Sequence, residues 1–233
     1  MIIKKAMILG AGFGKRMLPL TLKIPKPLIK ISSKNLLQRS IELLIKIGIK
    51  EIVINTHYLS QEIHNFIINQ NYKISISTVK EDILLDTGGG ILNATKKFEN
   101  DSFFVLNPDT IWNNNYYEEL KTLENSYLKN KNKPILLLVN KINCHDKSFK
   151  GDFNFIEQNH IIREASNQYV FTGAQIINRS VFKDIKEEVF SMNLVWNKII
   201  EEKKLLGQES NQTFFHLNNF KVYEELNKLK FID

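Results

Sequence analysis

The sequence predicts an α/β protein in which a mainly parallel sheet lies between two layers of helices. Two observations lead to this expectation. Over the first 80 residues, β-branched or apolar stretches alternate with helical patterns in the order strand, helix, strand, helix, strand. Two later stretches, 102–106 and 135–139, are continuously apolar, as is typical of strands buried on both faces. We therefore expect a Rossmann-like three-layer α/β/α fold with a mixed, mainly parallel sheet.

The individual elements follow from hydrophobic spacing and from turn residues. Apolar residues at helical spacing predict a helix over 33–47, ended by Gly48, and a helix over 61–68 with Ser60 as its N-cap. Residues 151–156 and 161–164 are expected to form a β-hairpin. The other predicted strands are 6–9, 51–55, 74–79, 102–106, 135–139, 169–177 and 213–219, and the other predicted helices are 116–128, 179–189, 192–203 and 221–229.

Length and composition narrow the class of protein. The 233 residues suit one domain, and 43% hydrophobic with 24% charged residues is ordinary for a chain that buries a core. The N-terminus lacks a signal-peptide pattern, and no apolar run approaches the roughly 20 residues that cross a membrane. The single cysteine, Cys144, cannot form an internal disulfide and suits a reducing compartment. We expect a cytoplasmic protein with no membrane partner.

The positive charge does not by itself indicate a nucleic-acid partner. The formal net charge is +7, but the lysines are dispersed and form no arginine-rich block. Solvated helix faces account for such a distribution, and we expect no nucleic-acid binding. An anionic small molecule would be attracted by the same field.

The first predicted strand runs directly into a glycine-rich turn. Gly10, Gly12 and Gly14 allow left-handed backbone conformations and bring N–H groups close to a ligand. Lys15 and Arg16 follow at once, which suits a polyphosphate. Glycine turns after a first strand are also common in α/β proteins without this function, so the turn alone leaves both interpretations open.

A constrained lysine follows in the segment Pro25-Lys26-Pro27. The two prolines lock φ, so we expect a segment that is not helical. A lysine fixed in this way is suited to deliver a point charge to a phosphate.

These two segments together resemble the signature of the sugar-phosphate nucleotidylyltransferases. The family pattern is Gly-x-Gly-x-Arg-(Met/Leu)-x-Pro-Leu-Thr followed by Pro-Lys-Pro-Leu, and residues 12–21 and 25–28 match it, with Lys15 where the family often has threonine. The resemblance implies Mg²⁺-dependent transfer of a nucleotidyl group from an NTP to a sugar 1-phosphate, giving an NDP-sugar and pyrophosphate. It also implies one domain over 1–233, with a nucleotide-binding core in 1–140 and a sugar-binding elaboration with C-terminal helices in 141–233. We expect a monomer or homodimer, without the β-helix or acyltransferase domain that often follows in the family.

The resemblance implies a role for each of a set of residues. Those expected to be catalytic are Arg16, Lys26 and Asp109. Those expected to bind the nucleotide are Gly10, Ala11, Gly12, Gly14, Lys15, Thr87, Gly88 and Gly89. Those expected to face the sugar are Asn107, Gly151, Glu164 and Thr172, of which Gly151 and Glu164 are equally explained as a hairpin turn and a surface charge.

The metal site is expected where a predicted central strand ends in Asn107-Pro108-Asp109. A carboxylate there can hold Mg²⁺, although this tripeptide is also good turn chemistry. The resemblance favours the metal, because the family places its metal-binding aspartate at this strand end. His216 stands where the family has a second aspartate, and histidine is a poor ligand for Mg²⁺. Either water completes the metal's coordination or His216 contacts phosphate.

The substrates are expected from residues 86–91, Asp-Thr-Gly-Gly-Gly-Ile. Three glycines at a helix start are costly unless a ligand approaches closely, and the alternative is a flexible turn. The form resembles the branch that makes UDP-N-acetylmuramic acid in cell-wall recycling, which favours UTP. Mannose-1-phosphate guanylyltransferase and glucose-1-phosphate thymidylyl- or uridylyltransferase remain alternatives, as does a nucleotide-binding sensor without catalysis. An NAD-dependent enzyme is disfavoured, because no acidic residue ends the second strand.

Overall fold

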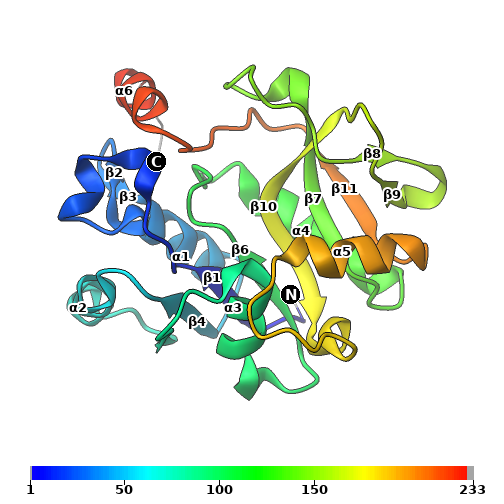
Figure 1. The fold of residues 1–233 in the computed structure, drawn as a ribbon, viewed down its shortest axis with the longest axis horizontal. Coiled ribbons are helices and arrows are strands. Elements are labelled where there is room, and N and C mark those ends of the chain that lie inside the picture. The colour runs from blue at the N-terminus through cyan, green and yellow to red at the C-terminus, as the bar shows by residue number, and fades with distance from the viewer. Residues whose placement is uncertain (1, 230–233) are drawn as a thin grey trace.

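The computed structural model describes residues 2–229, and its centre is a seven-stranded sheet (Figure 1). The strand order is β11-β7-β10-β6-β1-β4-β5, and β10 is antiparallel to both of its neighbours, whereas the other pairs are parallel. This confirms the predicted three-layer α/β fold. The strands are β1 (Lys5–Leu9), β4 (Glu51–Thr56), β5 (Ser75–Lys80), β6 (Ser102–Leu106), β7 (Ile135–Asn140), β10 (Tyr169–Asn178) and β11 (Leu206–Ser210).

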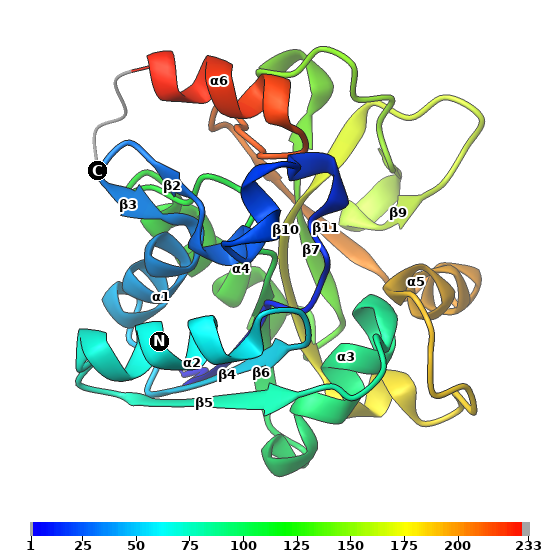
Figure 2. The ribbon, with the colours of Figure 1, turned by 60° about the vertical axis from the view of Figure 1, so that its left-hand side comes forward.

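Helices cover both faces of the sheet (Figure 2). One face packs against α1 (Leu36–Lys46), α2 (Ser60–Gln70) and α4 (Tyr116–Lys129), and the other against α3 (Asp86–Ala94) and α5 (Met192–Glu201). Side chains alternate along each strand, so Ala6 and Ile8 of β1 enter the first core and Met7 enters the second. None of the helices among residues 2–229 combines the length and the apolar character required to span a bilayer.

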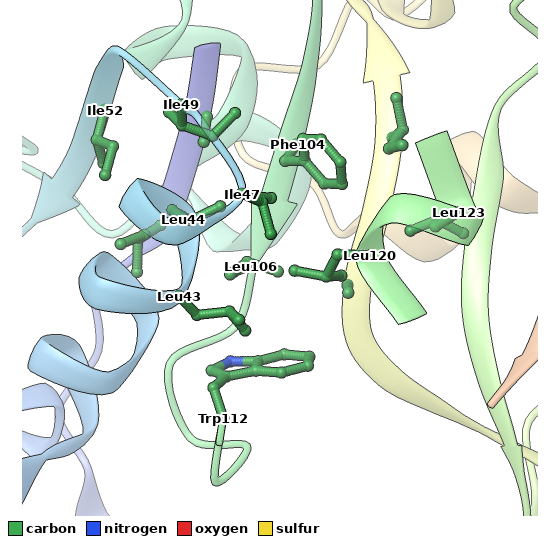
Figure 3. Close-up of a cluster of buried hydrophobic side chains, with 14 of the residues drawn as sticks. Leu43, Leu44, Ile47, Ile49, Ile52, Phe104, Leu106, Trp112, Leu120 and Leu123 are labelled. Atoms are coloured by element: carbon green, nitrogen blue, oxygen red, sulfur yellow. The ribbon is translucent and has the colours of Figure 1, made fainter. Parts of the chain in front are cut away.

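The larger core fixes the geometry around the ends of β1 and β6. Figure 3 shows Leu43 and Leu44 of α1, Phe104 and Leu106 of β6, and Trp112 packed together. These side chains are at most 4% exposed. Because interiors are close-packed, they hold the segment after β6 against α1.

The strand order places a topological switch beside β1. The chain passes from β1 to β4 and β5 on one side and then returns to place β6 on the other side. In open α/β sheets the loops at such a switch diverge and leave a crevice beyond the carboxyl ends of the strands. Here those loops are the glycine turn after β1 and the segment 107–115 after β6.

The N-terminal helices differ from the prediction at their starts. The helix predicted over 33–47 begins at Leu36, because β2 (Lys30–Ile31) and β3 (Lys34–Asn35) form a short hairpin before it. Asn35 caps it by accepting a hydrogen bond from the backbone N–H of Gln38 at 2.7 Å. The prediction of Ser60 as an N-cap is wrong, since α2 already includes Ser60 and is preceded by Leu59 with a φ of 50°.

Two predictions about local conformation have different outcomes, one for the segment around Lys26 and one for the hairpin near residue 158. Lys26–Leu28 forms one turn of 3₁₀-helix, so the expectation of a non-helical segment is wrong. The first turn of a helix tolerates proline, because a backbone N–H at that position would have no intrahelical partner. The hairpin is confirmed in shortened form as β8 (Asn154–Phe155) and β9 (Ile161–Ile162).

The C-terminal third contains the largest differences. Only Arg179–Phe182 of the helix predicted over 179–189 is helical, as a 3₁₀ turn, and the following chain instead packs on α3. The strand predicted over 213–219 forms isolated bridges, and the seventh strand is β11. Gly207 of β11 admits Phe155 and Ile161, which would lie 2.6 and 2.7 Å from a Cβ there. The last helix is confirmed as α6 (Phe220–Lys228).

Candidate functional site

A cavity of about 300 Å³ lies beyond the carboxyl ends of β1 and β6. It contains most of the residues that the sequence predicts for nucleotide binding and catalysis. Its lining consists of Leu9, Gly10, Ala11, Gly12, Gly14, Lys15, Arg16, Met17, Lys26, Pro27, Leu36, Thr87, Asn107, Pro108, Asp109 and Asn218. Three cationic side chains and one carboxylate therefore face a common space at the topological switch.

The glycine turn is held rigidly by its own hydrogen bonds. Gly14 has a φ of 61°, a conformation that favours glycine, and an added Cβ would lie 2.8 Å from the Cγ2 of Thr21. Its carbonyl accepts hydrogen bonds from the N–H of Met17 at 2.8 Å and from the hydroxyl of Thr21 at 2.9 Å. Met17 is fully buried, whereas Lys15 and Arg16 just before it are exposed. The turn is thus anchored by Met17 and its hydrogen bonds while its two cationic side chains stay exposed.

A buried polar network supports this turn from behind. Asn55, at the end of β4, accepts a hydrogen bond from the N–H of Gly10 at 2.9 Å and donates one to Glu81 at 2.7 Å. The second carboxylate oxygen of Glu81 accepts from the N–H of Leu85 at 3.0 Å, just before α3. Both side chains are 2% exposed. The network connects the glycine turn to the start of α3.

Sequence reasoning missed this network. The sequence predicts only a strand at Asn55, and Glu81 lies after β5 in a segment without a motif. The available signal was an asparagine that closes a run of β-branched residues at 52–54, because a polar residue at a buried strand end requires a partner.

The charged centre of the cavity consists of Lys26, Asp109 and His216. The Nζ of Lys26 lies 2.6 Å from the Oδ2 of Asp109, and the Nε2 of His216 lies 3.3 Å from the same oxygen. Burial raises the pKa of Asp109, but the positive charge of Lys26, the charge of His216 and the hydrogen bonds from both together outweigh it and hold this pKa well below its ordinary value. Asp109 is therefore a carboxylate at neutral pH.

The donor set around Asp109 suits a hard cation. Its Oδ1 is buried and has no hydrogen-bond partner among residues 2–229. A carboxylate oxygen of this kind is a preferred ligand of Mg²⁺. His216 does not line the cavity, and its ring contacts the rings of Phe149 and Phe214 with centroid distances of 5.9 Å to each. His216 therefore acts on Asp109 rather than on the cavity directly.

The glycines of 88–90 accommodate the protein itself. A Cβ on Gly88 would lie 2.4 Å from the ring of Phe190, and a Cβ on Gly89 would lie 2.3 Å from the carbonyl oxygen of Glu188. The N–H groups of Gly88 and Gly89 donate to the carbonyl of Phe190 at 2.9 and 3.0 Å. The close approach inferred from the sequence is real, but the group that approaches in this structure is the segment 188–190. Of the predicted residues in this loop, Thr87 reaches the cavity.

Three of the four predicted sugar-facing residues lie away from the cavity lining. Gly151 has a φ of 87° and packs against the backbone of Asn167, while Glu164 accepts a hydrogen bond from Asn154 within the same hairpin region. Thr172 is 1% exposed and its hydroxyl donates to the carbonyl of Leu137 at 2.8 Å. Asn107 lines the cavity, and so does Asn218, which is not among the residues predicted from the sequence.

Comparison with known proteins gives relatives that match a little under half of the chain. It is 38% identical over 112 residues to a probable mannose-1-phosphate guanylyltransferase 1 of Oryza sativa subsp. japonica, covering 46% of this chain and 31% of that protein. It is 38% identical over 110 residues to a mannose-1-phosphate guanylyltransferase catalytic subunit beta of Dictyostelium discoideum, with the same coverage. The matched part thus spans about a third of the length of these curated relatives.

Solved structures share the fold over nearly the whole chain. HddC from Yersinia pseudotuberculosis superimposes with a TM-score of 0.78 at 21% identity, covering 97% of this chain and 99% of that one. A UDP-glucose pyrophosphorylase complexed with UDP-glucose gives a TM-score of 0.80 at 18% identity, with 97% and 98% covered. A family model described as nucleotidyl transferase matches residues 5–138, more than half of the chain. The chain therefore belongs to the nucleotidyl transferase family.

Proposed function

We propose that this protein is a sugar-1-phosphate nucleotidyltransferase. The observation that carries the proposal is that the glycine turn, Lys26 and Asp109, which are far apart in the sequence, line one cavity at the topological switch. The membership of the nucleotidyl transferase family supports the same conclusion. A non-catalytic sensor would require only the nucleotide-binding part of this arrangement.

In the proposed reaction an oxygen of the sugar phosphate forms a bond to the α-phosphorus of the NTP. The bond between the α-phosphorus and the bridging oxygen to the β-phosphate breaks, and its electrons leave with pyrophosphate. Such a displacement requires positioning and charge neutralisation rather than a covalent nucleophile. The backbone of Gly10–Gly14 and the side chains of Lys15 and Arg16 would hold the β- and γ-phosphates, and Thr87 would lie towards the base.

Lys26 has the central role in this proposal. Its ammonium lies 2.6 Å from Asp109, and a Cβ added to Gly14 would lie 3.2 Å from the Cβ of Lys26, so the stem of the lysine is confined against the glycine turn. A positive charge held in this way can stabilise the negative charge that develops on the transferring phosphoryl group. Mg²⁺, when bound at Asp109, would supply further neutralisation of the triphosphate.

The substrate pair is proposed in two forms. The motif at 86–91 favours UTP and N-acetylmuramic acid 1-phosphate. The relatives named as mannose-1-phosphate guanylyltransferases favour GTP and mannose 1-phosphate. Both pairs use the same reaction and the same residues, so they differ in what the region near Thr87 accepts.

The test is pyrophosphate release by the purified protein with Mg²⁺. ATP, GTP, CTP, UTP and dTTP are each combined with N-acetylmuramic acid, mannose and glucose 1-phosphates. Activity confined to UTP with N-acetylmuramic acid 1-phosphate, or to GTP with mannose 1-phosphate, selects one form of the proposal. If all combinations fail while NTP binding is retained, the proposed transferase activity is wrong and the sensor is supported.

A further inference from the structure

Two buried oxygen atoms of residues that line the cavity lack a hydrogen-bond partner among residues 2–229. They are the Oδ1 of Asp109 and the Oδ1 of Asn218. A buried acceptor without a partner costs about 1–3 kcal/mol, so such atoms call for an explanation such as a bound ion. Carboxylate and amide oxygens are both ligands that Mg²⁺ accepts. Because both residues line the same cavity, their two free oxygens are available to one cation bound there.

The orientation of the Asn218 amide follows from its neighbour Asp146. The amide Nδ2 donates a hydrogen bond to the Oδ2 of Asp146 at 2.8 Å. A carboxylate accepts hydrogen bonds and an amide NH₂ donates them, so this contact defines which end of the amide faces Asp146. Asp146 is itself held by the N–H of Ser148 at 2.9 Å. The carbonyl oxygen of Asn218 is thus left for another group.

The backbone fixes Asn218 beside the segment that contains Asp109. The N–H of Leu217 donates to the carbonyl of Asp109 at 2.7 Å, and Thr110 forms an antiparallel bridge with His216. On the other side, Asn219 caps α6 by accepting from the N–H of Val222 at 3.0 Å. Asn218 is therefore held between two anchored residues.

His216 is engaged on the opposite oxygen of Asp109. Its Nε2 and the Nζ of Lys26 both approach Oδ2, which leaves Oδ1 available. Imidazole nitrogen is also a poorer ligand for Mg²⁺ than oxygen. We propose that Asn218 and Asp109, rather than His216 and Asp109, supply the protein ligands of the divalent cation. The proposal rests on the proposed function, since it assigns a ligand of the metal that the reaction uses.

The test measures metal binding directly, with Mn²⁺ as the probe and without nucleotide. Electron paramagnetic resonance of free Mn²⁺ gives the affinity of the wild-type protein and of its variants. Asn218→Ala should weaken binding by about tenfold or more, whereas His216→Ala should change it by less than about threefold. Asn65→Ala removes an exposed amide of α2 that lies outside the cavity lining and should leave the affinity unchanged. Circular dichroism shows that each variant is folded.

A rescue variant separates ligation from other roles of Asn218. Asn218→Asp keeps an oxygen at the same position and replaces the amide by a carboxylate, so this variant should bind Mn²⁺ at least as tightly as the wild-type protein. Pulsed electron paramagnetic resonance of the wild-type complex should show no coupling to an imidazole nitrogen. Such a coupling, or an Asn218→Ala variant with wild-type affinity, would overturn the proposal. If that variant keeps its Mn²⁺ affinity and instead raises the KM for the sugar phosphate, the Asn218 oxygen binds the sugar.

The outcome is separable from the test of the proposed function. Pyrophosphate release by the wild-type protein establishes the transferase whatever the ligands of the metal are. A wild-type protein that releases pyrophosphate but binds no Mn²⁺ without nucleotide refutes the assignment of Asn218 and leaves the transferase intact.

Discussion

Removing the Asn55 side chain should destabilise the protein more than removing any ordinary surface amide. Asn55→Ala leaves the N–H of Gly10 without its acceptor and one oxygen of Glu81 without its donor, both in a buried setting. Each buried group left unsatisfied costs about 1–3 kcal/mol. The sum is a loss of about 2–6 kcal/mol in the free energy of unfolding, a large part of the stability of a typical domain.

The assay is urea unfolding followed by circular dichroism and by tryptophan fluorescence. Trp112 and Trp196 lie in the cores on opposite faces of the sheet, so coincident transitions test whether unfolding is two-state. The matched control is Asn35→Ala, which removes another buried asparagine that accepts a single helix-capping bond and should cost about 1 kcal/mol. If Asn55→Ala costs no more than this control, the network does not support the glycine turn as described.

Three further predictions concern other parts of the molecule. Lys26→Ala should lower kcat by about 10²–10³-fold with a much smaller effect on NTP affinity, because a preorganised charge acts chiefly in the transition state. The control is Lys30→Ala, which removes an exposed lysine. Equal losses in rate and in NTP binding would contradict the proposed role of Lys26 in the transition state. Gly88→Ala should lower the free energy of unfolding by about 1–3 kcal/mol, because its Cβ would overlap the ring of Phe190. A double variant with Phe190→Leu should recover part of this loss. If the effects of the two substitutions on the free energy of unfolding are strictly additive, the ring is not the obstacle. Burial raises the pKa of the Cys144 thiol to about 11, so the thiol stays protonated at pH 8. It should therefore react with iodoacetamide about 100-fold more slowly than in the urea-unfolded chain, and the rate should rise as the pH approaches this pKa. Rapid labelling at pH 8 would contradict the described burial.

The sequence by itself determined the parts of the protein that depend on local chemistry. The alternation of strands and helices predicted the three-layer fold, and the signature at 12–28 identified the residues that line the cavity on the β1 side. These predictions succeeded because a glycine turn, a constrained lysine and a buried strand each follow from residues that are neighbours in the chain. The seventh strand was misplaced because 206–210 lacks an apolar pattern of its own and pairs with β7 as an edge of the sheet.

Tertiary structure decided which groups meet. Nothing local indicates that Phe190 covers the glycines of α3, that Asn55 and Glu81 join two loops, or that Asn218 lies beside Asp109. These contacts join residues 26 to more than 100 positions apart, and each depends on which side of the sheet the intervening chain crosses. Burial then makes them consequential, because a polar group removed from water must find its partner within the fold.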